Sequence, residues 1–183
     1  LDTVDWSPER DYKTGSEDEP LQFYIDSLCN SSSFDLLLGY FSSTAISVLS
    51  LGFTNFLYTG GMMRMVINNV LSEKDKEAIQ KGERGGVTTT FNLEDIRNLK
   101  DTLSEYGVHF FECLAWLIAH KRIQIKIIQP KELKGISHYK SGIFSDGKNK
   151  VGFKASCNFT AYGLLENLEH LDCFMSWEDK RSN

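Results

Sequence analysis

Apolar and polar positions follow two distinct patterns along the chain. Short runs that are almost wholly apolar occur at residues 34–39, 62–68 and 171–177, and a fourth run at 123–128 alternates before it becomes continuous. Apolar runs of this length are typical of strands that are buried in the middle of a sheet. We therefore predict a central sheet that contains these four segments.

Between these runs, apolar residues recur every three or four positions, which indicates amphipathic helices. One helix should begin at Ser42 or Ser43, and a later one at Ser72, because a serine hydroxyl can cap a helix. Gly60-Gly61 ends the first of these two helices. The expected helices span residues 21–29, 42–58, 72–82, 92–106 and 108–120.

A β-hairpin is predicted near the C-terminus, because residues 138–144 and 150–153 flank the turn dipeptide Asp146-Gly147. Strands thus alternate with helices at first and then form a hairpin. This order predicts an α/β fold with a mixed β-sheet flanked by helices on both faces. Residues 1–20 are polar and partly acidic, so we expect an N-terminal arm with little core content and one domain over residues 21–183.

The composition is that of an ordinary globular protein, with 41% hydrophobic and 25% charged residues. No apolar run reaches the roughly 18 residues that a membrane span requires, so no membrane partner is expected. The first residues carry no secretion signal, and they lack an initiator Met. We expect a cytoplasmic protein of which this chain is a piece.

The four cysteines are Cys29, Cys113, Cys157 and Cys173, and they form no C-x-x-C pair. This spacing argues against a zinc knuckle. The favoured interpretation is free buried thiols in a reducing cytosol. We expect no metal and no other cofactor.

Charge is distributed unevenly along the chain. The net charge is −5, which argues against a general nucleic-acid coat. Between Lys121 and Lys154, however, nine Lys and Arg residues stand against Glu132 and Asp146 alone. Such a segment either binds a phosphate-bearing substrate or forms a solvated face without a partner, and charge alone does not separate the two readings.

Polar side chains follow the predicted strands 34–39 and 62–68. They are Tyr40, Ser42, Ser43 and Asn68. In α/β sheets, binding sites gather at the carboxyl ends of strands, near a switch in strand order. These residues are therefore candidates for the rim of one pocket.

Two pairs of polar residues in the hairpin region suggest phosphate chemistry. His138 and Lys140 are two positions apart on a predicted strand, so their side chains should share a face. Two potential cations repel each other unless an anion lies between them, and a phosphate is the obvious anion. Ser156 and Asn158 repeat the spacing and offer neutral hydrogen-bond donors.

These motifs resemble the phospholipase D superfamily, whose motif is H-x-K-x4-D followed by G-S-x-N. The chain has His-Tyr-Lys at 138–140, Ala-Ser-Cys-Asn-Phe-Thr at 155–160, and then Gly163-Leu164, Asn167 and Glu169. The ending is most similar to the nuclease branch, in particular to restriction endonucleases and helicase-linked domains. Gly-Tyr-Phe-Ser-Ser at 39–43 and Gly-Gly-x-x-Arg-Met-Val-Ile-Asn at 60–68 are similar to that branch as well.

The resemblance implies a metal-independent phosphodiesterase that acts on DNA. His138 would attack phosphorus and form a phosphohistidine, while Lys140 and Asn158 bind the non-bridging oxygens. Ser156 would support the site. Glu169, or less readily Glu166, would accept a hydrogen bond from the imidazole and fix its tautomer.

The same mechanism requires a second histidine, which protonates the leaving oxygen. The other histidines are His109, His120 and His170, and none of them lies in an H-x-K motif. We therefore predict a homodimer in which two copies of His138 face each other across a two-fold axis.

Two positions depart from the family's motif. Ser145 stands where the family has Asp, one residue before Asp146, and Ala155 stands where it has Gly. A short bulge before the turn would bring Asp146 into place. Neither change removes the proposed nucleophile or its phosphate ligands.

Three functions remain open from the sequence. The first is a dimeric DNA endonuclease with a role in restriction or phage defence. The second is a nucleic-acid-binding module with little catalysis, attached to a helicase or to another partner. The third is a phosphodiesterase on a lipid or another non-nucleic substrate. No base-reading motif is recognisable, so a helicase or DNA-recognition domain in the longer protein is an expected partner.

Overall fold

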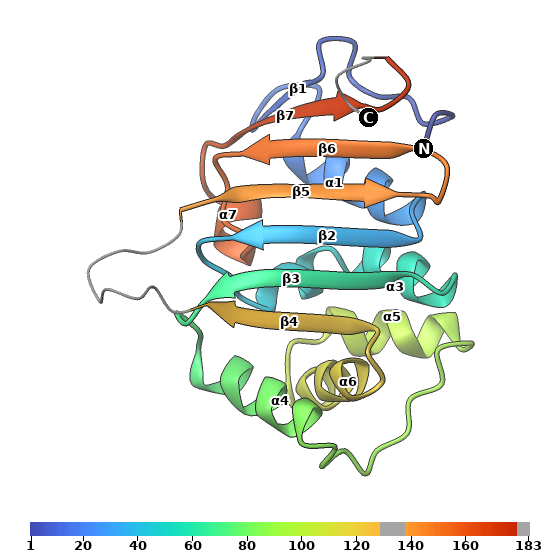
Figure 1. Ribbon diagram of the computed structural model, residues 1–183, viewed down its shortest axis with the longest axis vertical. Coiled ribbons are helices and arrows are strands. Elements are labelled where there is room, and N and C mark those ends of the chain that lie inside the picture. Colours follow the sequence, from blue (N-terminus) through green and yellow to red (C-terminus); the bar gives the residue numbers. More distant parts are fainter. Residues whose placement is uncertain (129–137, 179–183) are drawn as a thin grey trace.

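A seven-stranded sheet forms the centre of the computed structural model, which describes residues 1–128 and 138–178 (Figure 1). The strands lie in the order β1-β7-β6-β5-β2-β3-β4. They are β1 (Asp11–Lys13), β2 (Ser33–Leu38), β3 (Met62–Asn68), β4 (Ile123–Ile128), β5 (Lys140–Ser145), β6 (Lys150–Ala155) and β7 (His170–Met175).

The sheet is mixed, as the sequence predicts. β2 pairs parallel with β3, and β3 pairs parallel with β4. On its other side β2 pairs antiparallel with β5, and the hairpin of β5 and β6 continues the antiparallel part through β7 to β1. The change from parallel to antiparallel pairing falls at β2, so the carboxyl end of β2 lies beside the start of β5.

The helices are α1 (Pro20–Cys29), α2 (Thr44–Val48), α3 (Ser50–Tyr58), α4 (Glu73–Glu83), α5 (Ile96–Ser104), α6 (Val108–Ala119) and α7 (Ala161–Leu165). In Figure 1, α1, α3 and α7 lie behind the sheet, and α4, α5 and α6 gather beside the edge formed by β4. Ser72 caps α4 as predicted, because its hydroxyl accepts from the backbone N–H of Asp75 at 3.1 Å.

Aromatic packing between the sheet and α1 forms the centre of the core. Phe34 of β2 and Phe144 of β5 are register partners, and their rings stack with centroids 4.0 Å apart. Phe23 of α1 lies edge-on to Phe144 and to Phe153. All of these side chains are buried, and burial of large apolar side chains is the main stabilising contribution to a fold of this size.

One prediction about the layers needs correction, because helices cover a single face of the sheet in the described residues. The opposite face presents Leu37, Arg64, Ile143, Lys154 and Phe174, which are partly or fully exposed around a hollow of about 780 Å³. The reason is the strand order. β2, β3 and β4 advance in one direction, so the right-handed crossovers that join them all pass over the same face.

Three local expectations also differ from the structure. The segment 1–20 contributes β1 to the sheet and buries Trp6 and Tyr12, whereas little core content was expected of it. The helix predicted over 42–58 is two helices, since the backbone of Leu49 leaves the helical conformation between them. The helix predicted over 92–106 is shorter and begins after Asp95, whose carboxylate caps it.

Within the described residues, no helix is long and apolar enough to cross a membrane. All four cysteines are free, as the sequence predicts, and three of them are buried.

Candidate active site

The candidate site lies where β2 ends and β5 begins. Lys140 pairs with Leu38 in the register of these strands, and the N–H of Gly39 donates to the carbonyl of Tyr139 at 2.7 Å. The loop after β2 also contacts the segment that follows β6, because the N–H of Ser42 donates to the carbonyl of Phe159 at 3.1 Å. These backbone bonds bring three separate segments to one edge of the sheet.

Lys140 and His138 form a direct contact. Nζ of Lys140 lies 3.2 Å from Nε2 of His138. Lys140 is 9% exposed, and this is the only hydrogen bond of its ammonium within the described parts of the chain. A buried ammonium without a carboxylate is costly, so this position is suited to bind an anion.

His138 approaches Lys140 from a loop, which corrects one detail of the prediction. β5 begins at Lys140, so His138 precedes the strand and is exposed. The two side chains nevertheless meet as expected. The ring of His138 stands at the rim of the site, while the ammonium of Lys140 lies beneath it.

Ser156, Asn167 and Glu169 form a second hydrogen-bonded group, in the segments before and after Asn158. The hydroxyl of Ser156 donates to one carboxylate oxygen of Glu169, and Nδ2 of Asn167 donates to the other at 3.0 Å. Glu169 therefore anchors Ser156 and Asn167, and no bond between Glu169 and His138 occurs among the described residues. The N–H of His170 also donates to the hydroxyl of Ser156, at 2.9 Å.

The charges of Glu169 and of Lys140 both act on the thiol of Cys157. Burial is the largest cause that raises the pKa of its thiol, which reaches about 11. The negative charge of Glu169 raises the pKa further, and the positive charge of Lys140 acts in the opposite direction. The segment 156–158 thus lies within electrostatic range of both groups.

A pocket of about 640 Å³ opens beside Asn158. Tyr40 and Ser42, two of the residues predicted for the rim, line it together with Asn158. The sequence reasoning did not select Thr44 and Tyr162, which line it too. No sequence pattern points to Thr44. Tyr162, in contrast, lies inside the motif that follows Asn158, so its aromatic side chain could have been selected as a candidate for substrate binding.

Asn68 occupies a different place from the one expected. Its side chain is buried and does not line this pocket. Nδ2 of Asn68 donates to the carbonyl of Gly39 at 2.8 Å, so the residue links the end of β3 to the loop that carries Tyr40. Ser43 is buried as well, with its hydroxyl 3.3 Å from that of Tyr106.

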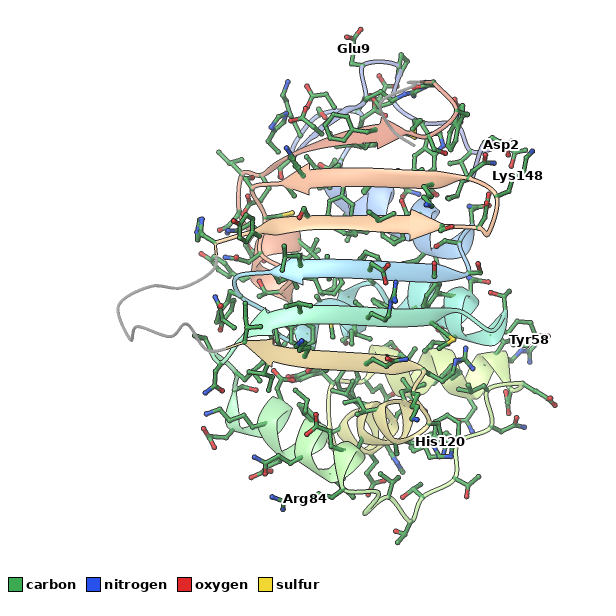
Figure 2. All side chains as sticks on the ribbon, in the orientation of Figure 1. Asp2, Glu9, Tyr58, Arg84, His120 and Lys148 are labelled. Carbon is green, nitrogen blue, oxygen red and sulfur yellow. The ribbon has the colours of Figure 1, made fainter. Side chains whose placement is uncertain are left out.

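Asp146 lies at the other end of β5 from Lys140, so a bulge cannot bring it into the site. Its carboxylate accepts from the backbone N–H groups of Lys148 and Asn149 in the hairpin turn, at 2.9 and 2.6 Å. It also binds the amine of Leu1 at 2.7 Å. Figure 2 shows Lys148 of this turn on the side opposite to the end of β2. Asp146 is a turn residue.

None of the other histidines contacts His138 in the described chain. His120 stacks on Trp116 at the end of α6, and Figure 2 labels it far from the end of β2. His109 is exposed at the start of α6. His170 lies on the open face of the sheet, where its Nε2 is 2.6 Å from Asp11.

One group of side chains has the composition of a metal site. Asp11, His170 and Asp172 present ligand atoms within 4.8 Å of one another on the open face. Lys13 binds the carboxylate of Asp11, and His170 contacts both acids. These ion pairs account for the cluster as a structural feature of the β1–β7 edge.

Comparison with known proteins places this arrangement in a structural class. No family model and no curated protein matches the sequence. Among solved structures, NucT from Helicobacter pylori matches with a TM-score of 0.52 and 11% identity, over 89% of this chain and 82% of that one. A mutant of yeast tyrosyl-DNA phosphodiesterase matches with a TM-score of 0.50 and 13% identity, over 90% of this chain and 32% of that one.

A third structure, Nuc from Salmonella typhimurium, is described as a phospholipase D family member. It matches with a TM-score of 0.48 and 12% identity, over 89% of this chain and 79% of that one. The first two matches show that the chain shares the fold of NucT and of the yeast tyrosyl-DNA phosphodiesterase. At these identities a match establishes the fold, and the function has to be argued from the residues of the site.

Proposed function

We propose that the protein is a metal-independent phosphodiesterase that cleaves DNA through a phosphohistidine at His138. The observation that carries the proposal is the buried ammonium of Lys140, whose only hydrogen-bond partner in the described residues is His138. A phosphate oxygen at this position would neutralise the ammonium. The fold that the chain shares with tyrosyl-DNA phosphodiesterase supports the same reaction class.

The contact between the two side chains also suggests which nitrogen reacts. A lysine ammonium has only hydrogens to donate, so Nε2 of His138 must be the acceptor in their hydrogen bond. The lone pair is then on Nε2 and the proton is on Nδ1. An unprotonated nitrogen beside the phosphate-binding ammonium has the properties that a nucleophile requires.

The remaining site residues would bind substrate or support the residues that do. Asn158 would donate its amide to a second non-bridging oxygen, since it lines the adjacent pocket. Ser156 and Glu169 would hold the segment that carries Asn158. Tyr40 and Ser42 would form the substrate-binding wall, and Asn68 would fix the loop between β2 and α2.

The reaction would need two protomers. In the first step, Nε2 of His138 forms a bond to phosphorus and the bond from phosphorus to the leaving oxygen breaks, while the partner's His138, in its protonated imidazolium form, gives that oxygen its proton. In the second step, the partner's His138 takes a proton from water, and the oxygen of the resulting hydroxide forms a bond to phosphorus. The bond from phosphorus to Nε2 breaks, which releases the product and restores His138. The chain supplies no second histidine at the site within its described residues, which supports a homodimer with a shared site.

Exposed apolar side chains beside the site fit such an interface. Leu168 is 89% exposed and precedes Glu169, and Tyr139 is 61% exposed between His138 and Lys140. Large apolar side chains in such positions commonly mark a surface that binds a partner. Both flank residues of the site, so a second copy docked here would bring two copies of His138 together.

A role in restriction or phage defence, in the cytoplasm and with a helicase or DNA-recognition domain, is the setting that the sequence resemblance supports. The proposal is tested by a cleavage assay in EDTA on plasmid DNA and on a single-stranded oligonucleotide, with His138→Ala as the matched variant. We expect cutting by the unmodified chain and none by the variant. DNA binding without cutting would favour the non-catalytic module, and hydrolysis of a phospholipid in place of DNA would favour the third function.

A further inference from the structure

The pocket beside Asn158 has a lining unlike that of a phosphate site. Of its lining residues only Glu166 carries a charge, and that charge is negative. The rest of the wall consists of hydroxyls, amides, a few apolar groups and the two aromatic rings of Tyr40 and Tyr162. A phosphate would be repelled from the Glu166 end, whereas a neutral ligand with hydrogen-bonding edges and a flat face would fit there.

The two tyrosines are available to such a ligand. Tyr162 is 68% exposed and Tyr40 is 42% exposed, and neither ring has an aromatic partner within the described chain. Their backbones are well anchored. Tyr162 lies in α7, which is capped by Thr160 through a 2.9 Å bond to the N–H of Gly163. Tyr40 lies in the loop held by the bond from Asn68 to Gly39.

The polar groups of the wall are fixed in place too. Oγ1 of Thr44 donates to Oγ of Ser42 at 3.0 Å and accepts from the N–H of Ala161 at 3.0 Å. Nδ2 of Asn167 is held by Glu169 at 3.0 Å. The pocket is therefore a preformed cavity, and Asn158, one of the residues assigned to the phosphate, lines it.

We infer that this pocket binds the nucleoside attached to the scissile phosphate, with the base against the tyrosine rings. The inference rests on the proposed function and deepens it, because it defines the form of the nucleic acid. A base inside a duplex is stacked on both faces and paired along its edge, so it cannot enter a cavity of about 640 Å³ without leaving the helix. The substrate is therefore single-stranded or locally unpaired DNA.

The test compares small esters that differ only in the nucleoside. Thymidine 5′-(p-nitrophenyl phosphate), its 3′ isomer and methyl p-nitrophenyl phosphate share the phosphodiester and the leaving group. We expect kcat/KM for one thymidine ester to exceed that for the methyl ester at least tenfold. Tyr162→Ala should reduce this ratio about tenfold, as expected for the loss of one stacked base, and Tyr162→Phe should retain it.

Tyr58→Ala is the matched control. Tyr58 is 49% exposed, close to the exposure of Tyr40, and Figure 2 shows it on the side opposite to the end of β2. This variant should keep the ratio of the unmodified protein. An unchanged ratio in both Tyr162→Ala and Tyr40→Ala would overturn the inference, and this outcome would not contradict the proposed phosphodiesterase activity.

A binding experiment separates this inference from the proposed function. If no ester is hydrolysed faster than by His138→Ala, the proposed function fails, and the pocket is then tested by fluorescence anisotropy with labelled oligothymidylate. We expect Tyr162→Ala to weaken binding of the single strand about tenfold. We also expect a duplex of equal length to bind more weakly than the single strand. Equal affinities of the unmodified protein and Tyr162→Ala would reject the pocket as a nucleoside site.

Discussion

Nζ of Lys140 lies 3.2 Å from Nε2 of His138, although only Lys140 belongs to a strand. The pairing places a buried cation directly against an exposed imidazole. In the absence of an anion this arrangement is unfavourable for Lys140, since its ammonium has lost water and gained no carboxylate. A buried charge without an opposite charge costs stability, so a role in binding an anion explains Lys140 better than a role in stabilising the fold.

Lys140→Met tests this distinction. The substitution keeps most of the side-chain volume and removes the ammonium, so cleavage should fall about 10² to 10³-fold, as for the loss of one donor to a developing oxyanion. Thermal unfolding should occur at the same temperature or higher, because a poorly compensated buried charge disappears. A variant that unfolds at a clearly lower temperature would instead assign Lys140 to the stability of the fold.

Asp146 should affect stability and leave cleavage unchanged. Burial raises the pKa of Asp146, but hydrogen bonds from the Leu1 amine and from the N–H groups of Asn149 and Lys148 outweigh it and lower the pKa to about 2. Asp146→Ala should lower the free energy of unfolding at pH 7 by about 1 to 2 kcal/mol. Urea unfolding measures this loss, and a DNA cleavage assay should show less than a twofold change.

The effect of Asp146 should also depend on pH. Its pKa is lower in the folded protein, about 2, than in an unfolded chain, where it is about 3.9. The carboxylate therefore stabilises the fold fully above the unfolded value, and the contribution is lost as the pH falls through about 2. The difference in the free energy of unfolding between the unmodified protein and Asp146→Ala should shrink as the pH falls from about 3.9 to about 2. A difference that stays constant from pH 7 to pH 2 would contradict the assignment.

The cysteines should react in a defined order with a thiol reagent. Burial raises the pKa of Cys113 and of Cys173 to about 12 and that of Cys157 to about 11, so these thiols are both shielded and protonated at pH 8. Cys29 is only half-buried. Titration of the native protein should detect one thiol, and titration in denaturant should detect four. Rapid reaction of more than one thiol in the native protein would count against this packing.

Leu168 provides a test of the shared site. Leu168→Asp places a charge on an apolar side chain that is 89% exposed, so it should convert a dimer to a monomer and reduce cleavage in parallel. Analytical ultracentrifugation follows the mass, which is 20.8 kDa for one chain. Val108→Asp is the control, because Val108 is 79% exposed at the start of α6, outside the segments that carry the residues assigned to the site. A monomeric unmodified chain that still cleaves DNA would exclude the shared-site mechanism.

The sequence by itself determined most of the strands and the proximity of His138 to Lys140. The apolar runs at 62–68 and 123–128 correspond to β3 and β4 without a shift. Such runs are decided locally, since a short apolar segment has few other ways to bury its side chains. The pairing of His138 with Lys140 also depends on neighbouring positions, and it survives although His138 lies outside β5.

The tertiary structure alone decided which residues surround that pair. Tyr40 and Tyr162 are far apart in the sequence, and they meet at one pocket because β2 and β6 end at the same edge of the sheet. The single helical layer follows from the order of the strands, and the place of Asp146 follows from the length of β5. These features depend on long-range pairing, and the periodicity of a sequence carries no information about which distant strands become neighbours.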